Sequence, residues 1–319
     1  MVDIIIIGCS GLVGKTLIQI IQEYSFPIDK LVLVGNSNVG EIINVNNNNH
    51  KIVSIADSLK MLLIAPFIFY CTDSKIVEES YFEYIDAYPD CKIIDNSSYF
   101  RESMPIIIPP INKHLIAGQN IYPNPNCTTS GIVMVLYPIN KVNKVTEVRV
   151  TSFQAVSGSG YEGINQLQRE RKGDFTKLFY DKPICNNIIP QIGPIKNSIS
   201  EEESKVMNET RKILDNADLD IYATCVRIPV DNCHSVSLEF KLEKETNLEN
   251  IVNILSEQTM LSVFINDIIE YDNCKKHPNV VVTRLRKHNN SFFCFITFDN
   301  LYRGAAYNSY EIAYSILNS

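Results

Sequence analysis

The chain has 319 residues, of which 45% are hydrophobic and 20% are charged. This composition excludes a largely disordered chain and supplies enough core for about two domains. The formal net charge of −7 argues against a nucleic-acid-binding protein, which needs a basic surface to neutralise phosphates. No apolar stretch approaches the roughly 20 residues that cross a bilayer, and the first residues lack the basic region and cleavage site of a signal peptide.

The cysteines indicate a reducing compartment. There are nine, an odd number, and no two of them form a CxxC pair, which argues against a thioredoxin-type or zinc-ribbon site. We therefore expect free thiols, no metal site and a cytoplasmic protein that does not bind a membrane.

The first part of the chain has the pattern of an open, mostly parallel α/β sheet. The β-branched apolar run at residues 3–8 predicts a strand buried on both faces, and the apolar spacing in residues 15–24 predicts a helix after it. The asparagine-rich residues 44–50 predict a solvated loop. Further strands are predicted at residues 30–34, 67–71, 92–95 and 105–110, and a helix at residues 74–86.

From Pro125 the pattern changes to that of an α+β unit. Residues 146–154 and 226–243 predict longer alternating strands. Amphipathic helices are predicted at residues 201–217 and 248–262, and a last helix, which could return to the first unit, at residues 307–317.

A glycine pattern, GxxGxxG, follows the first strand and opens the first helix. Such glycines let the backbone approach a pyrophosphate, which the helix N-terminus then binds through its N–H groups and positive dipole end. A merely tight structural turn is the alternative. We predict dinucleotide binding by residues of this turn, namely Gly8, Ser10, Gly11, Leu12, Val13 and Gly14.

The turn after the second strand bears on the choice of cofactor. It carries Gly35-Asn36-Ser37-Asn38, without the carboxylate that usually binds the ribose hydroxyls of NAD. A 2′-phosphate would not be repelled there, although no Arg or Lys stands ready to bind it. The turn favours NADP, with NAD as the alternative, and Ser37 and Asn38 are candidate contacts.

Cys127 is the candidate nucleophile. The segment Asn124-Pro125-Asn126-Cys127-Thr128-Thr129 precedes an apolar run and predicts that a helix begins near Cys127. A helix N-terminus favours a thiolate, and its free N–H groups could hold an oxyanion. The other cysteines have no such context and are expected to be buried and inert.

His234 is the candidate proton partner among five histidines. It lies in the stretch 226–235, where an Arg and a His flank a turn between two strand-like runs. On the residues alone, a hydrogen-bonded core histidine and a catalytic one are equally supported.

These segments resemble those of the aspartate-β-semialdehyde dehydrogenase family, in matching order and spacing along nearly the whole chain. The matching segments are GCSGLVG (8–14), IIDNSSYFR (93–101), NPNCTTSG (124–131), FQAVSGSG (153–160), NNIIPQIG (186–193), EESKVMNETRKIL (202–214), VRIPVDNCHS (226–235) and DNLYRGAA (299–306). The resemblance implies a Rossmann-like NADP-binding domain at residues 1–124, completed by a C-terminal helix at residues 299–319. It also implies an α+β catalytic and dimerisation domain at residues 125–298, in a homodimer.

The resemblance also implies a reaction, the NADPH-dependent reductive dephosphorylation of L-aspartyl 4-phosphate to L-aspartate 4-semialdehyde. This step belongs to lysine (diaminopimelate), threonine and methionine biosynthesis. The implied catalytic residues are Cys127 as nucleophile, His234 as acid/base and Gln154 as positioning amide. The implied substrate contacts are Arg101, Asn126, Gln154, Glu202, Lys205 and Arg227, with Arg227 on the α-carboxylate, Glu202 on the ammonium, and Lys205 and Arg101 on the phosphate. Ser157, Gly158 and Asn300 are implied cofactor contacts.

The chain departs from the family at two informative positions. Cys233 stands where glycine often precedes the catalytic histidine, and would be strained if that position has positive φ. Ser37 stands where arginine is common. The alternatives are N-acetyl-γ-glutamyl-phosphate reductase, glyceraldehyde-3-phosphate dehydrogenase and a catalytically dead relative that serves as a scaffold.

Overall fold

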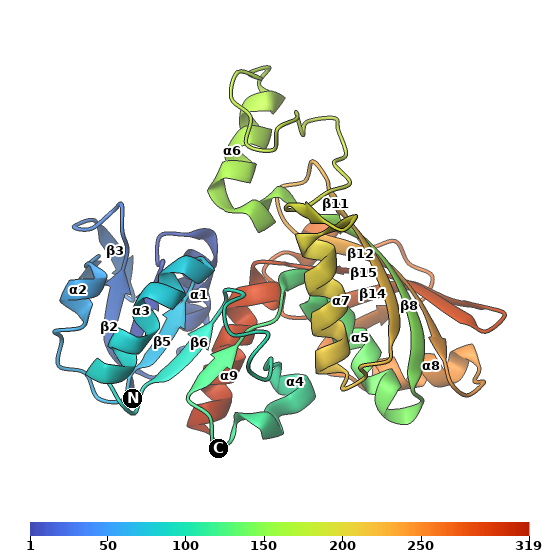
Figure 1. Ribbon diagram of the computed structural model, residues 1–319, viewed down its shortest axis with the longest axis horizontal. Helices are drawn as coiled ribbons and strands as arrows, with labels where there is room; N and C mark the ends of the chain where they lie inside the picture. Colours follow the sequence, from blue (N-terminus) through green and yellow to red (C-terminus); the bar gives the residue numbers. More distant parts are fainter. Residues whose placement is uncertain (319) are drawn as a thin grey trace. The chain divides into compact units, whose positions relative to one another are not determined.

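A computed structural model describes residues 1–318, which form two compact units (Figure 1). The first holds Met1–Pro125 and the described residues from Ala305 onward, and the second holds Asn126–Gly304. The first unit holds a parallel sheet and the second a mixed sheet with helices, so the predicted α/β fold class is confirmed. Within residues 1–318 no helix is both long enough and apolar enough to cross a bilayer.

The sheet of the first unit is wholly parallel, in the order β2-β1-β5-β6-β7. Its strands are β1 (Val2–Ile7), β2 (Ile28–Val34), β5 (Phe67–Tyr70), β6 (Lys92–Asp95) and β7 (Ile121–Pro123). The helices of this unit are α1 (Leu12–Glu23), α2 (Ile55–Ser58), α3 (Ser74–Ala87), α4 (Pro109–Asn112) and α9 (Tyr307–Leu317). Consecutive residues of β1 are buried, because helices cover both faces of the sheet.

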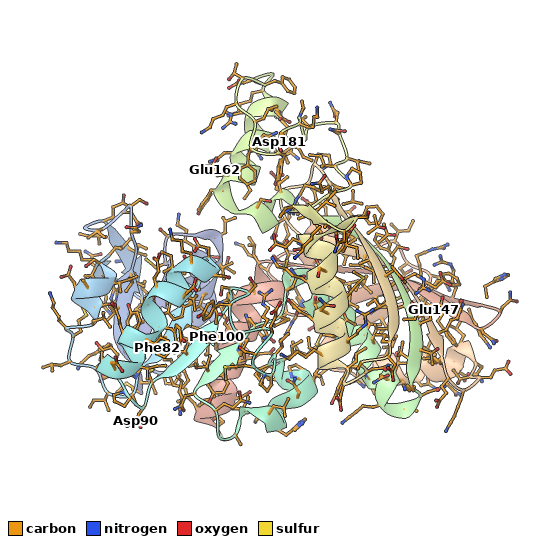
Figure 2. All side chains as sticks on the ribbon, viewed as in Figure 1. Phe82, Asp90, Phe100, Glu147, Glu162 and Asp181 are labelled. Atoms are coloured by element: carbon orange, nitrogen blue, oxygen red, sulfur yellow. The ribbon has the colours of Figure 1, made fainter. Side chains whose placement is uncertain are left out.

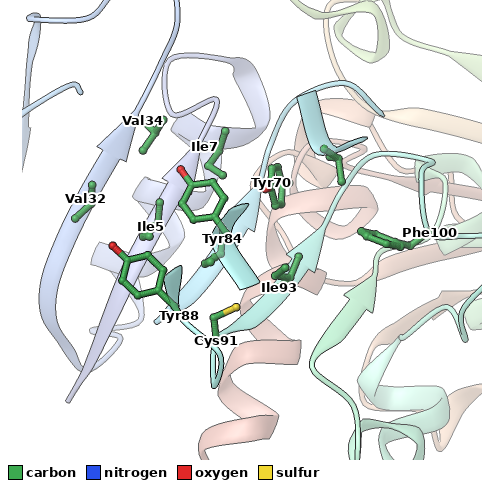
Figure 3. Close-up of a cluster of buried hydrophobic side chains, with 12 residues drawn as sticks. Ile5, Ile7, Val32, Val34, Tyr70, Tyr84, Tyr88, Cys91, Ile93 and Phe100 are labelled. Atoms are coloured by element: carbon green, nitrogen blue, oxygen red, sulfur yellow. The ribbon is translucent and has the colours of Figure 1, made fainter. Parts of the chain in front are cut away.

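One core of this unit lies between the sheet and α3 (Figure 3). Ile5 and Ile7 of β1 point to this side together with Tyr84 of α3. The other face packs against α1 and α9, where Phe26 contacts both Phe67 of β5 and Tyr310 of α9. The C-terminal helix therefore completes the core of the first unit.

Buried amides tie α9 to the carboxyl ends of the strands. Asn124 Nδ2 donates to Asn96 Oδ1 at 2.6 Å and to Ser309 Oγ at 2.8 Å. Asn308 Nδ2 donates to Asn124 Oδ1 at 2.5 Å and to the carbonyl of Ile107 at 2.8 Å. These bonds fix the last helix beside the segment that leads out of the unit toward Cys127.

Two local predictions in this unit were wrong. Residues 105–110 form no strand, because Pro109 and Pro110 cannot donate to a ladder and instead occupy the first turn of α4. Residues 44–50 are not a loop but most of a hairpin of β3 (Ile42–Val45) and β4 (Asn48–Lys51). Asn46 and Asn47, with φ of 50° and 64°, form its turn, which asparagine tolerates.

The helical part of the C-terminal segment is shorter than the residues 299–319 assigned to it. A π-helical turn covers Tyr302–Ala306, α9 covers Tyr307–Leu317, and residues 299–304 belong to the second unit.

The second unit is built on a six-stranded sheet in the order β11-β8-β12-β15-β14-β13. The strands are β8 (Val145–Gln154), β11 (Asp220–Arg227), β12 (His234–Leu242), β13 (Leu261–Phe264), β14 (Val280–His288) and β15 (Ser291–Phe298). Two short strands, β9 (Ile195–Lys196) and β10 (Ile199–Ser200), pair separately. The β8–β11 and β13–β14 pairs are parallel and the others in the sheet antiparallel.

Helices α5 (Cys127–Val142), α7 (Glu201–Ile213) and α8 (Leu248–Ser256) cover one face of this sheet (Figure 1). Helix α6 (Gly160–Arg171) follows a 3₁₀ turn after β8. The predicted long strand at 226–243 is two segments, because residues 228–233 form a turn between β11 and β12. The predicted helices at 201–217 and 248–262 end earlier, at Ile213 and Ser256, and residues 261–264 form a strand.

Candidate active site

Three predicted site residues form a row across neighbouring strands of the second unit. Arg227, the last residue of β11, pairs with Gln154, the last residue of β8. His234 opens β12 and pairs with Phe298 of β15, and its Nε2 lies 3.4 Å from Gln154 Nε2. The side chains of these three residues and of Phe298 are at least 96% buried and lie on the sheet face that α5 and α7 cover. Strand register therefore assembles residues that lie far apart in the sequence.

Helix α5 brings Cys127 to this row. The predicted helix start is confirmed: Asn126 is the N-cap, its Oδ1 accepts from the N–H groups of Thr128 and Thr129, and Cys127 is the first helical residue. One turn later, an added Cβ at Gly131 would lie 2.1 Å from the ring of Phe298. Glycine here lets α5 approach the sheet more closely than any other residue would.

Cys127 Sγ lies 3.4 Å from His234 Nε2. The N–H of Ala155 donates to His234 Nδ1 at 3.1 Å, so Nδ1 is an acceptor and the neutral ring carries its proton on Nε2, toward the sulfur. Burial, and secondarily the charge of Arg227, lowers the pKa of His234 well below 6.5. The imidazole is thus neutral at neutral pH and presents an N–H to the sulfur.

The predicted oxyanion donors need correction. The N–H groups of Thr128 and Thr129 are already bonded to the Asn126 side chain, so they are not open to a substrate. The side-chain amide of Gln154 is the better candidate, because its Nε2 has two hydrogens. One donates to Glu202 Oε1 at 3.0 Å, while the same nitrogen faces His234.

Glu202 lies at the centre of the amide contacts. Its Oε1 accepts from both Gln154 Nε2 and Asn126 Nδ2, the latter at 2.9 Å, and the side chain is buried. Lys205, expected on the same face of α7, instead pairs with Glu201 at 2.5 Å in a partly exposed salt bridge. The two residues predicted to act together thus have different partners.

Arg227 is held by its surroundings but keeps one donor unused. Its Nη1 donates to the carbonyl of Ala155 at 2.5 Å, and its guanidinium lies 5.9 Å from the ring centre of Tyr180. Within residues 1–318 its buried Nε has no hydrogen-bond partner. An added Cβ at Gly158 would lie 2.9 Å from Arg227 Nη1 and 3.4 Å from His234 Nε2, so glycine keeps this space open.

The other predicted contacts in the second unit cluster beside this row. Asn300 Nδ2 donates to Ser157 Oγ at 3.0 Å, and Ser157 precedes Gly158. Asp299 accepts from Asn232 Nδ2 at 2.9 Å. Ser157, Gly158 and Asn300 therefore belong to one hydrogen-bonded region near His234.

The predicted dinucleotide turn lies in the first unit. Gly8 has φ of 79°, and added Cβ atoms at Gly8 and Gly14 would lie 2.5 Å and 2.3 Å from backbone oxygens. Gly11 is the N-cap of α1, and among residues 1–318 no side chain caps it. Bare N–H groups above close-packed glycines are the arrangement that a pyrophosphate requires, so the residues fit a dinucleotide.

Ser37, Asn38 and Arg101 also lie in the first unit. Asn38 folds back over Gly35, and its buried Oδ1 has no partner within residues 1–318, so a ribose hydroxyl could satisfy it. Arg101 is buried, with Nε donating to the carbonyl of Asn124 and Nη2 to that of Asn96.

Cys233 has φ of 68°, in the left-handed region that glycine favours. The strain anticipated from the sequence is therefore present next to His234. Its side chain is buried with Cys274 and Val281.

Burial keeps several of the other thiols protonated. It raises the pKa of Cys9, Cys91 and Cys274 to about 11, and of Cys225 and Cys294 to about 12, so these thiols stay protonated at neutral pH. Among residues 1–318, no group of three His, Cys, Asp or Glu side chains could hold a metal ion.

Sequence reasoning missed three groups at this site. They are the N–H of Ala155, the ring of Tyr180 beside Arg227, and Glu209, whose Oε2 accepts from the N–H of Asn126 at 2.6 Å. Only Glu209 left a sequence signal, since it follows Glu202 by seven residues on one helix.

Comparisons with known proteins agree with this geometry. Residues 3–119 match the family model of the semialdehyde dehydrogenase NAD binding domain, and residues 136–303 that of the semialdehyde dehydrogenase dimerisation domain. The aspartate-semialdehyde dehydrogenase of Shewanella sp. (strain DB6705) is 31% identical over 98% of this chain and 96% of its own length. The aspartate-semialdehyde dehydrogenase of Helicobacter pylori (strain J99) is 32% identical over 98% of this chain and 97% of its own length. The structure of aspartate semialdehyde dehydrogenase II from Vibrio cholerae, complexed with ASA, superposes with a TM-score of 0.93 at 25% identity, over 100% of this chain and 99% of that one. The chain belongs to the semialdehyde dehydrogenase family, and the relatives it resembles in sequence are aspartate-semialdehyde dehydrogenases.

Proposed function

We propose that the chain is an aspartate-semialdehyde dehydrogenase, which reduces L-aspartyl 4-phosphate with NADPH to L-aspartate 4-semialdehyde, phosphate and NADP⁺. The reaction would supply lysine, threonine and methionine biosynthesis. The observation that carries the proposal is the 3.4 Å contact between Cys127 Sγ, at a helix N-terminus, and His234 Nε2.

Cys127 attacks the acyl carbon of the substrate as a thiolate. The C–S bond forms, the bond from carbon to the phosphate oxygen breaks, and inorganic phosphate leaves a thioester on the sulfur. A nicotinamide cofactor, when bound, would supply the hydride that reduces this thioester. The alkoxide of the thiohemiacetal would then collapse: the C–S bond breaks, the aldehyde is released, and Cys127 is again a thiolate beside His234.

His234 and Gln154 act on the charges that develop during these steps. The Nε2–H of neutral His234 faces the sulfur and donates a hydrogen bond to the thiolate of Cys127. To take the proton of the Cys127 thiol, Nε2 must be the unprotonated nitrogen, in the tautomer that carries its proton on Nδ1 and gives up the hydrogen bond from Ala155. The amide of Gln154 is placed to donate to the oxyanion of the tetrahedral species.

Substrate recognition uses the buried charges around this pair. Arg227, with an unused Nε, binds the α-carboxylate in the bidentate manner that guanidinium favours. Glu202 binds the ammonium, for which it has a second carboxylate oxygen. Lys205, Arg101 and the Asn126 amide are the proposed phosphate contacts.

The cofactor is NADP, with NAD the alternative. Gly8, Ser10, Gly11, Leu12, Val13 and Gly14 would bind the pyrophosphate, Ser37 and Asn38 the adenosine ribose, and Ser157, Gly158 and Asn300 the nicotinamide half. The uncapped start of α1 supports this assignment.

A reverse assay tests the proposal. The wild type should reduce NADP⁺ in the presence of aspartate semialdehyde and phosphate, and Cys127→Ala should abolish turnover and the thioester detected on Cys127 by mass spectrometry. An alanine variant with near-normal activity contradicts the mechanism. A wild type that prefers N-acetylglutamate semialdehyde assigns the chain to the N-acetyl-γ-glutamyl-phosphate reductases instead, because that substrate has no ammonium for Glu202.

The chain is proposed to form a homodimer, as its match to a dimerisation domain indicates. The support is the sheet face opposite α5, where Phe153, Phe293 and Phe295 are only half-buried. Glu147, labelled in Figure 2, lies on the same face of β8. Phe295→Lys should convert a dimer to a monomer in analytical ultracentrifugation; an unchanged dimer places the interface elsewhere.

The protein is proposed to be cytoplasmic. All nine cysteines lie within the described residues and none of them forms a disulfide, as expected in a reducing compartment.

A further inference from the structure

A second buried carboxylate of α7 contacts the segment that carries the nucleophile. Glu209 is 6% exposed, and its Oε2 accepts a hydrogen bond from the backbone N–H of Asn126 at 2.6 Å. Glu202, seven residues earlier and therefore on the same face of α7, accepts from the side chain of Asn126 at 2.9 Å. Both carboxylates thus hold the residue that directly precedes Cys127.

Asn126 is bonded through every kind of polar group it has. Its N–H donates to Glu209 and its Nδ2 to Glu202, while its Oδ1 accepts from the N–H groups of Thr128 and Thr129. Its carbonyl accepts from the N–H of Ser130 at 2.9 Å. Because Cys127 shares a peptide unit with Asn126, these bonds also fix the backbone of the nucleophile.

The Glu209 contact replaces a bond that many helices make locally. In a capping box, the side chain of the third helical residue accepts from the N–H of the N-cap residue. Helix α7 does this itself, through Ser200 and Glu203. In α5 the third residue is Thr129, whose buried Oγ1 has no hydrogen-bond partner within residues 1–318. The carboxylate comes instead from the neighbouring helix.

We infer that Glu209 is a positioning residue for the reaction: it completes the cap of α5 from α7 and thereby fixes the sulfur of Cys127 relative to His234. The inference rests on the proposed function. A displacement of about 1 Å between reacting groups can lower turnover about 100-fold. Loss of the Glu209 contact should therefore lower kcat more than it raises KM.

The test compares Glu209→Ala with Glu209→Gln. Both variants lose the charge, but only glutamine keeps an oxygen that can accept the N–H of Asn126. We expect Glu209→Ala to lower kcat by on the order of 10–100-fold with little change in KM, and Glu209→Gln to recover most of the loss. The reaction of Cys127 with iodoacetamide at pH 7 should likewise be slower in the alanine variant than in the glutamine variant.

Glu203→Ala is the matched control. Glu203 is a carboxylate on the same helix that also accepts backbone N–H groups, those of Ser200 and Cys225, but not that of Asn126. It should lower the urea midpoint while kcat stays near that of the wild type. Glu209→Ala with the same loss of stability and an unchanged kcat overturns the inference, as does a glutamine variant no better than alanine. A wild type inactive on aspartate semialdehyde refutes the proposed function, while the iodoacetamide comparison still tests Glu209.

Discussion

Gly131 determines how closely the nucleophile's helix approaches the sheet, and Gly131→Ala tests this directly. The added Cβ would lie 2.1, 2.5 and 2.6 Å from three carbons of the Phe298 ring, whereas ordinary contact begins near 3.4 Å. The helix or the ring must therefore move by about 1.3 Å, and Phe298 is fully buried. Overpacking of this kind costs about 1–3 kcal/mol of stability. A shift near 1 Å between Cys127 and His234 should lower kcat about 100-fold.

The sign of the stability change separates this reasoning from a simple propensity effect. Replacing glycine by alanine inside an unconstrained helix raises the free energy of unfolding by about 1 kcal/mol. For Gly131→Ala we expect the opposite, a lower free energy of unfolding in urea denaturation. Phe298→Leu should restore part of both kcat and stability when combined with Gly131→Ala, because it makes room for the methyl group. A more stable Gly131→Ala with normal kcat would refute the close-packing argument.

Three further perturbations act on neighbouring groups. Burial depresses the pKa of His234 below 6.5, so on acidification only the unfolded chain takes up a proton at this residue. Lowering the pH from 7.5 to 5.5 should therefore reduce the free energy of unfolding of the wild type by up to about 1.4 kcal/mol more than that of His234→Asn, measured by urea denaturation. Equal losses in the two proteins would contradict a neutral buried imidazole. Arg227→Lys keeps the positive charge but loses the two parallel N–H donors of the guanidinium, so KM for aspartate semialdehyde should rise. Wild-type kinetics in this variant would show that the α-carboxylate of the substrate binds elsewhere. Cys233→Gly should be about 1 kcal/mol more stable than Cys233→Ala, because only alanine retains the strain at φ of 68°, and equal urea midpoints would show that the turn relaxes.

Helices and strands were easier to predict from the sequence than the contacts between distant segments. The thiol at a helix start was predictable because Asn126 and the following apolar run are local signals. The row of Arg227, Gln154 and His234 was not, because it depends on the register of strands whose paired residues, such as Arg227 and Gln154, are 73 or more positions apart in the chain (227 − 154 = 73). The Phe298–Gly131 contact joins segments that are farther apart still.

The errors have equally local causes. Residues 44–50 were expected to be a loop because asparagine is a turn residue, yet only Asn46 and Asn47 form the turn, and their neighbours pair as strands. The oxyanion prediction failed because the side-chain oxygen Oδ1 of Asn126 already accepts from the N–H groups of the first turn. The Asn126 cap is visible in the sequence, and it leaves the N–H groups of Thr128 and Thr129 without a free hydrogen for an oxyanion.

The bonds from Asn124 to Asn308 and Ser309 have a consequence for biosynthesis of the chain. The ribosome makes α9 only after all of Asn126–Gly304, yet α9 closes the core of the first unit. The second unit is continuous in sequence and can fold while the first still waits for its last helix, which reverses the usual N-terminal-first order. Until then, residues 1–125 expose the sheet face that carries Phe67. In a protease assay on nascent chains, we expect the first unit to become resistant to cleavage only after the second unit has done so.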